Sequence, residues 1–131
     1  MQPIRILIVN NDNRLLAGLV TALEICPDID PVGTATNGLE AMGLCQELDP
    51  DVVLMELMLP ELDGISAIQG ICRNQPHIQI ITLSKFLEKD LIRKANQVGA
   101  AGHIRLGDSA DSIAATIRDV YHRTPQKASS P

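Results

Sequence analysis

The sequence has few aromatic residues, no excess of positive charge and no long apolar run. Its 131 residues include one Phe, one Tyr and no Trp, so a folded interior must be aliphatic. The net charge of −5 argues against direct nucleic-acid contact, because binding a phosphate backbone needs clustered Lys and Arg. No apolar run approaches the roughly 20 residues that a membrane span needs, so we expect no membrane contact.

Cysteine is also scarce. Cys26, Cys45 and Cys72 are an odd number without metal-ligand spacing, and the pattern places all three in helical segments. We therefore expect buried, reduced thiols in a cytoplasmic protein. The first residues enter an apolar strand at once, without the pattern of a secretory signal peptide.

Short apolar runs alternate with segments of helical period along the chain. The predicted strands cover residues 4–9, 32–36, 52–55, 78–83 and 102–105. The predicted helices run from a cap at Asp12 or Asn13 to before Pro27, over 38–48, from 64 past 71, over 88–98, and from about 108 to 122. This alternation predicts an α/β fold, a doubly wound, flavodoxin-like sheet of five parallel strands with helices on both faces. We expect one domain over residues 1–122 and a linker or disordered tail over 123–131.

In such sheets, functional sites form at the carboxyl ends of the strands. The predicted strands place Asn10, Asn11, Glu56 and Ser84 on this rim, together with the residues that follow Ile104. The rim is therefore where we look for function.

Residues 50–64, PDVVLMELMLPELDG, form the most informative segment: an apolar strand, one acid at its end, and a Pro-x-x-Asp-Gly turn. The same order of landmarks continues with a strand that ends in serine, a Val-Gly-Ala-x-Gly turn at 98–102 and a closing helix. Over residues 4–122 the chain resembles the receiver domain of two-component response regulators, the CheY-like superfamily. The segment DSIAATIRDVYHRTPQ, residues 111–126, resembles the passage from receiver to linker in regulators that carry a LuxR-type helix-turn-helix.

The resemblance implies an acceptor aspartate at the position of Glu56 and two Mg²⁺-binding carboxylates at those of Asn10 and Asn11. In this chain the three positions carry one formal negative charge instead of three. Amide oxygens are poor partners for a hard dication, so we expect weak or absent Mg²⁺ binding and no cofactor. Asp12 either bends back to lend a carboxylate or caps the next helix, and we favour the cap.

Other positions of the resemblance also differ. A lysine is implied where Leu106 stands, and leucine cannot pair with a phosphoryl oxygen. Ser84 matches the switch hydroxyl, or it satisfies loop amides as a strand-end serine. His103 matches the aromatic switch position and is either a toggle near neutral pH or, as we favour, an edge-strand residue with its tip in water. Asp63 and Gly64 are expected to be structural, as a helix cap and as a residue in a conformation that others avoid.

The leading hypothesis is a non-enzymatic pseudo-receiver that regulates transcription through protein partners, in which Glu56 acts as a fixed phosphate mimic bonded to Ser84 or to loop amides. Partners, or a second copy, would use the face formed by residues 88–98, 102–105 and 108–122, with contributions from Phe86, Leu87, Leu91 and His103. Two alternatives stay open. One is a phosphorylatable receiver with an acceptor at Glu56, Asp12 or Asp63, and the other is a small-ligand domain, although no Gly-rich phosphate loop is present.

Overall fold

The computed structural model describes residues 2–85 and 88–123. Strands and helices alternate along the chain as β1 (Ile4–Val9), α1 (Asn13–Glu24), β2 (Ile29–Ala35), α2 (Gly38–Leu48), β3 (Val52–Glu56), α3 (Gly64–Asn74), β4 (Gln79–Ser84), α4 (Lys89–Gln97), β5 (Gly102–Arg105) and α5 (Ala110–Arg123). The predictions that concern Phe86, Leu87 and the tail from residue 124 lie outside the described residues.

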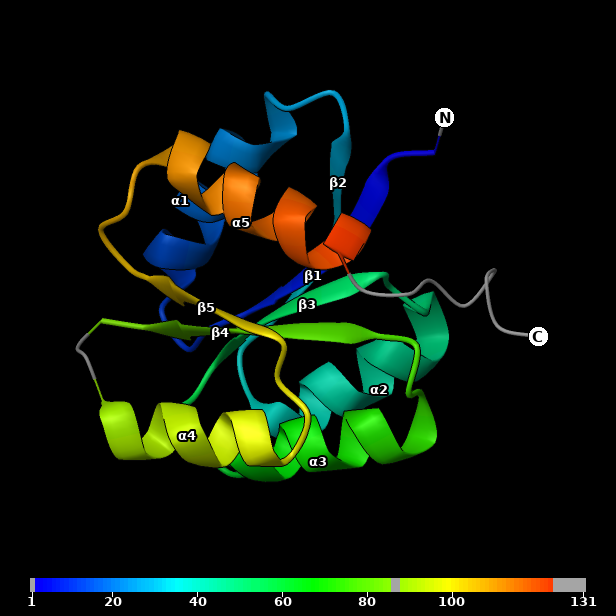
Figure 1. Ribbon diagram of the computed structural model, residues 1–131, viewed down its shortest axis with the longest axis vertical. Helices are drawn as coiled ribbons and strands as arrows, with labels where there is room; N and C mark the ends of the chain where they lie inside the picture. The colour runs from blue at the N-terminus through cyan, green and yellow to red at the C-terminus, as the bar shows by residue number, and fades with distance from the viewer. Residues whose placement is uncertain (1, 86–87, 124–131) are drawn as a thin grey trace.

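The strands form one parallel sheet in the order β2-β1-β3-β4-β5. Helices α1 and α5 cover one face, and α2, α3 and α4 cover the other (Figure 1). The prediction of a doubly wound sheet with helices on both faces is therefore confirmed. No helix in the described part of the chain is long and apolar enough to cross a membrane.

Aliphatic side chains fill the space on both sides of the sheet, as the lack of aromatics requires. Alternate residues of β1 and β3 point to opposite faces, so Ile6 and Leu54 pack with α1 and α5 while Leu7 and Val53 pack with α2 and α3. Both layers exclude water from the strands, which explains why these strands read as continuous apolar runs.

Strand β2 begins three residues before the predicted start at residue 32. Ile29 is buried and pairs with Ile4 of β1, so the strand already begins at Ile29. The register then shifts: Ile6 pairs with Pro31, whereas the next residue, Leu7, pairs with Gly33. Proline is tolerated here because β2 is an edge strand and a bulge relieves the pairing.

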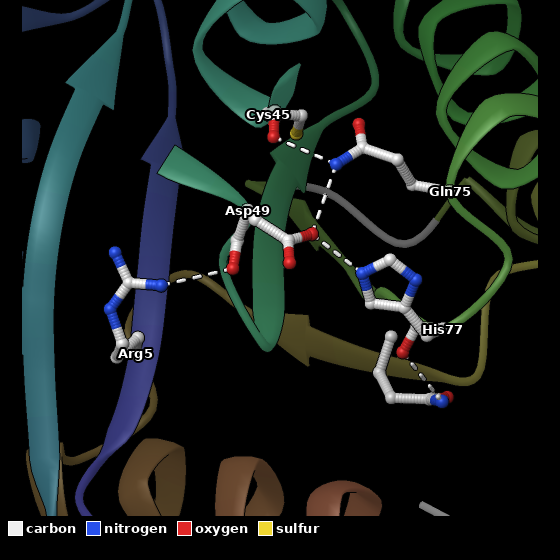
Figure 2. Close-up of polar contacts among 6 residues, drawn as sticks. Arg5, Cys45, Asp49, Gln75 and His77 are labelled. Carbon is white, nitrogen blue, oxygen red and sulfur yellow. Dashed lines mark hydrogen bonds and ion pairs between the residues drawn. The ribbon is translucent and has the colours of Figure 1, made fainter. Parts of the chain in front are cut away.

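A polar network ties the chain together at the end of the sheet opposite the rim (Figure 2). Asp49 ends α2 in a left-handed conformation, with φ of 47°, and its backbone carbonyl accepts a hydrogen bond from the Arg5 guanidinium at 3.0 Å. Its carboxylate contacts Nε2 of His77 at 2.5 Å and accepts a hydrogen bond from Gln75 Nε2 at 3.0 Å. The network joins the ends of α2 and α3 to β1.

The cysteines fit the prediction only in part. All three are free thiols, but only Cys45 is buried, and Cys26 lies beyond the end of α1 rather than in a helix. Cys72 is half-buried in α3. Burial raises the pKa of Cys45 to about 12, so this thiol stays protonated and acts as a small core residue.

Candidate functional site

A cavity of about 220 Å³ opens at the carboxyl ends of β1 and β3. Its lining brings together most of the rim positions that the sequence singled out, namely Asn10, Asn11, Asp12, Leu15, Glu56, Lys85 and Leu106. We call it the rim cavity. A second cavity of about 300 Å³ lies on the other side of Glu56 and is lined by Met58, Ser84, Lys85 and Glu88.

The two asparagines of the rim differ in their surroundings. Asn10 is only 3% exposed, and its side-chain oxygen accepts a hydrogen bond from the Asp12 N–H at 2.8 Å. Asn11 is exposed. Asp12 caps α1, because its Oδ1 accepts hydrogen bonds from the N–H groups of Arg14 at 2.9 Å and Leu15 at 3.3 Å. The capping interpretation of Asp12 is therefore right.

Glu56 ends β3 and is buried at the point where the two cavities meet. The residue is only 9% exposed, and its Oε2 is inaccessible and has no hydrogen-bond partner in the described residues. The pKa of this carboxyl group is raised, mainly by burial. A hydrogen bond from the Met58 backbone lowers the pKa, the charge of Glu88 raises it further, and the charge of Lys85 lowers it. The only buried acid among the described residues is thus incompletely paired.

The backbone of Glu56 packs against the start of α3. A Cβ atom on Gly64 would lie 2.5 Å from the Glu56 carbonyl oxygen and 2.7 Å from Cα of Leu57. Gly64 does not have a positive φ, so the expectation of an unusual backbone conformation is wrong, and close approach explains the glycine instead. Asp63 caps α3 as expected, since its Oδ1 accepts a hydrogen bond from the Ser66 N–H at 2.8 Å.

Gly64→Ala should therefore destabilise the fold and displace the Glu56 backbone. We expect a loss of about 2 kcal/mol or more in the free energy of unfolding, since the added methyl meets backbone atoms that cannot rotate away. The matched control is Gly43→Ala in α2, where no heavy atom lies within 4 Å of the added Cβ. That control should gain about 0.5–1 kcal/mol, because alanine is the better helix former. Urea unfolding of both variants measures the difference, and equal effects would contradict the packing argument.

His103 bridges two hydroxyl groups of the neighbouring strand. Its Nδ1 lies 2.7 Å from Thr82 Oγ1, and its Nε2 lies 3.1 Å from Ser84 Oγ. Thr82 pairs with His103 across the two strands, and Ser84 lies two residues further along the same face. The expectation that the histidine tip lies in water is wrong.

The hydrogen bonds also indicate the histidine tautomer. Because the Thr82 hydroxyl donates to the Gly102 carbonyl at 3.3 Å, Nδ1–H of His103 is the donor to Thr82, and Nε2 accepts from Ser84. Burial is the main cause that lowers the pKa of His103, with Asp108 opposing it and Arg105 adding to it, which favours this neutral form. The Ser84 hydroxyl therefore donates to His103 and not to Glu56, so of the two partners expected for Glu56 a loop amide remains, with the Met58 backbone as the donor.

The match to known proteins agrees with this arrangement of strands and helices. Residues 6–118 match the response regulator receiver domain family. The chain belongs to this family. It is 35% identical over 123 residues to the transcriptional regulatory protein LiaR of Bacillus subtilis (strain 168), covering 94% of this chain and 58% of LiaR. It is 31% identical over 115 residues to the response regulator protein VraR of Staphylococcus aureus (strain COL), covering 88% of this chain and 55% of VraR.

Solved receivers have the same fold. The response regulator domain of Thermotoga maritima CheB superposes with a TM-score of 0.86 at 28% identity, covering 95% of this chain and 100% of that domain. The signal receiver domain of the putative response regulator NarL from Mycobacterium tuberculosis gives 0.89 at 22% identity, covering 95% and 100%. The receiver described here thus spans somewhat more than half the length of LiaR and VraR.

Leu106, where the resemblance implies a lysine, contributes an apolar wall to the rim cavity. It is half-buried against the core beneath α1 and α5, and its backbone N–H donates to the Ser84 carbonyl at 2.8 Å. Lys85 also lines the cavity but is exposed and forms no ion pair with Glu56 in the described chain. In the residues that the structure describes, no group of three or more His, Cys, Asp or Glu is placed to hold a metal ion.

Sequence reasoning missed Thr82, Leu15 and Met58. Thr82 could have been found from the period of β4, which places it on the same face as Ser84. Leu15 and Met58 enter the site through loop and helix geometry, for which the sequence carries no comparable signal.

Proposed function

We propose that this receiver domain signals by binding protein partners without being phosphorylated and without enzymatic activity. The observation that carries the proposal is the composition of the rim cavity. Glu56 is its only buried acid, the amide of Asn10 stands where the resemblance implies a metal-binding carboxylate, and Leu106 stands where it implies a lysine. Phosphoryl transfer depends on neutralising charge with metal ions and a cation, and Asn10 and Leu106 supply neither. Lys85 is the cation in the cavity lining, but it is exposed and forms no ion pair with Glu56 among the described residues.

Two further side chains support the proposal by being engaged elsewhere. Asp12 and Asp63 are the alternative phosphoryl acceptors, and in each of them Oδ1 accepts a hydrogen bond from a backbone N–H at a helix N-terminus. Ser84 directs its hydroxyl to His103 rather than to the rim cavity. The geometry therefore favours a fixed signalling state over one that is switched by phosphate.

The relatives suggest the setting in which such a domain works. LiaR is by name a transcriptional regulatory protein, and the match covers 58% of it. We propose that the whole protein regulates transcription through a LuxR-type DNA-binding domain, while the acidic segment described here makes no direct contact with nucleic acid.

We further propose that partners, or a second copy, contact the face of α4, β5 and α5. Its exposed residues are mainly charged or polar and include Arg93, Arg105 and Asp111. Leu91 is half-buried against the core, so its main role is packing, and the contact surface is polar. Such a surface fits a transient signalling interface better than a permanent dimer.

Acetyl phosphate with millimolar Mg²⁺ tests the proposal. Intact-mass spectrometry should show no phosphoryl adduct on the wild-type chain, because the described residues offer no group of three or more acids, histidines or cysteines for a metal ion and a glutamate in place of the implied aspartate. A receiver that retains the acceptor aspartate serves as the positive control in the same buffer. A stoichiometric adduct on the wild-type chain would overturn the proposed function.

A further inference from the structure

Helix α2 has one solvent-exposed face that combines an apolar side chain, a glycine and two acids. The exposed residues of the helix are Leu39, Glu40, Gly43, Gln46 and Glu47. At 3.6 residues per turn, these positions fall within about a third of the helix circumference. Ala41 and Cys45 are buried against the sheet on the opposite side. We call the five exposed residues the outer face of α2.

Leu39 is a large apolar side chain left in water. It is 58% exposed and belongs to neither core layer, and among the described large hydrophobic residues only Ile25 and Met58 are more exposed. The start of the helix is held in place beside it, because a Cβ atom on Gly38 would lie only 2.3 Å from the Leu62 carbonyl oxygen. Leu39 thus forgoes the stabilisation that burial of a leucine gives, and a partner that covered it would recover that stabilisation.

Gly43 lies at the centre of the same face, and packing within the chain does not explain it. No heavy atom lies within 4 Å of a Cβ atom built there, and its φ is not positive. Glycine inside a helix costs stability relative to alanine. A partner does explain the residue, because the missing side chain allows a second molecule to approach the α2 backbone closely.

The charges are segregated along the chain. Residues 15–72 contain ten acidic residues and no Lys, Arg or His, whereas the rest of the chain holds all eleven Lys and Arg and six acids. The acidic segment includes β2 at one edge of the sheet, while α4 connects β4 to β5 near the other edge, and α3 lies between α2 and α4 (Figure 1). The α2 side of the domain is therefore acidic and attracts a basic partner.

Two of these acids lie on the outer face itself. Glu47 is exposed and forms no ion pair among the described residues. Glu40 is also exposed, and its Oε1 accepts a hydrogen bond from the Thr36 N–H at 2.6 Å, which holds the carboxylate at the start of the helix. Lys or Arg side chains of a partner would pair with both carboxylates.

A helix is the partner structure that matches this surface. Leu39, Gly43 and Gln46 follow one another at spacings of four and three residues, so they line up along the side of α2, as residues at a contact between two helices do. An extended peptide would need free backbone groups to pair with, and the middle of a helix offers none because its own hydrogen bonds satisfy them.

We propose that the outer face of α2 binds a basic amphipathic helix of a protein partner. An apolar side chain of that helix covers Leu39, the two backbones approach closely at Gly43, and Lys or Arg side chains pair with Glu40 and Glu47. This surface shares no residue with the rim cavity or with the face of α4, β5 and α5. The inference therefore goes beyond the proposed function and does not depend on it.

The test uses a synthetic peptide in which Leu and Lys follow the period of an amphipathic helix. It is titrated into ¹⁵N-labelled protein at fixed pH and about physiological ionic strength. A peptide with Glu in place of every Lys controls for charge, and a scrambled peptide of the same composition controls for amphipathicity. We expect saturable shifts centred on the amides of Leu39, Gly43 and Glu47 with the first peptide only.

Three variants separate the contributions. Glu47→Gln should weaken binding about two- to fivefold, as expected for one exposed ion pair. Leu39→Ser should weaken it about tenfold through the lost apolar contact. Gly43→Gln should weaken it about tenfold or more, because the added side chain blocks close approach. The same variant should be at least as stable as the wild type in urea, because glutamine favours a helix more than glycine does.

Two matched controls lie on α1, on the other face of the sheet. Glu24→Gln removes the same charge from the same acidic segment, and Gly18→Gln adds the same side chain at an exposed position where no heavy atom lies within 4 Å of an added Cβ. Both should leave the affinity nearly unchanged. The inference is overturned by equal effects of the α1 and α2 variants, by full affinity of Gly43→Gln, by equal binding of either control peptide, or by the absence of saturable shifts.

Discussion

The variant that carries Asn10→Asp, Asn11→Asp, Glu56→Asp and Leu106→Lys should accept one phosphoryl group from acetyl phosphate in Mg²⁺, whereas the wild-type chain should accept none. The four positions lie on one cavity at the carboxyl ends of the strands, so the changes are made where the receiver scaffold already converges. Two new carboxylates supply anionic oxygens for the metal ion, and the lysine supplies a cation for the phosphoryl oxygens.

The local structure should tolerate these changes. Asn10 uses its side-chain oxygen to accept the Asp12 N–H, and an aspartate keeps that acceptor. Asn11 is exposed, so a charge there meets little desolvation. Oε2 of Glu56 has no hydrogen-bond partner among the described residues, so Glu56→Asp loses no hydrogen bond at that atom. Without metal, we expect repulsion among the clustered carboxylates to lower stability.

Intact mass and thermal unfolding together measure the restoration. A metal ion at 100 times its dissociation constant adds about 2.7 kcal/mol, so Mg²⁺ should raise the melting temperature of the variant visibly and that of the wild type little. Calcium and a matched concentration of NaCl control for general ionic effects. Reverting each position singly should show that the Glu56→Asp change is indispensable. A folded variant that binds Mg²⁺ but takes up no phosphoryl group would show that the assignment of the acceptor position is wrong.

The fold could be predicted because the spacing of apolar residues along the chain distinguishes strands from helices. Apolar runs such as Ile4–Val9 and Val52–Glu56 have to be buried on both faces, and the helical segments between them supply the cover. The start of β2 was missed because Pro31 reads as a strand breaker, and only the bulge beside Leu7 shows how the edge accommodates it.

The side-chain contacts of the site were harder to predict, because they depend on register and on close packing between segments distant in sequence. The bridge from His103 to Thr82 and Ser84 exists only because β4 and β5 pair in one register. Likewise, Gly64 is required by the distance from α3 to the end of β3, which no local pattern encodes. The identity of the rim residues was readable from the sequence, but their partners were not.

Glu56→Gln should stabilise the domain at neutral pH, and the gain should disappear in acid. Burial raises the pKa of Glu56, so the folded state favours the protonated carboxyl group. The contribution of this group to stability is therefore fully present below the unfolded pKa of about 4.3 and is lost as the pH rises through the higher folded value. Glutamine is neutral throughout and keeps an oxygen for the Met58 N–H, so it avoids this loss.

We expect the Gln variant to gain on the order of 1 kcal/mol at pH 7, because it removes a buried charge but leaves a polar amide in its place, and to have a melting temperature higher by several degrees. Thermal unfolding of both proteins between pH 4 and pH 8 measures the difference, which should grow as the pH rises. Glu47→Gln is the matched control, because Glu47 is exposed in α2 and should show no such trend. A Gln variant less stable than the wild type at pH 7 would mean that the Glu56 carboxylate is paired in solution, with Lys85 in the cavity lining as the candidate cation. A gain at pH 7 would instead show that burying the Glu56 carboxylate opposes folding.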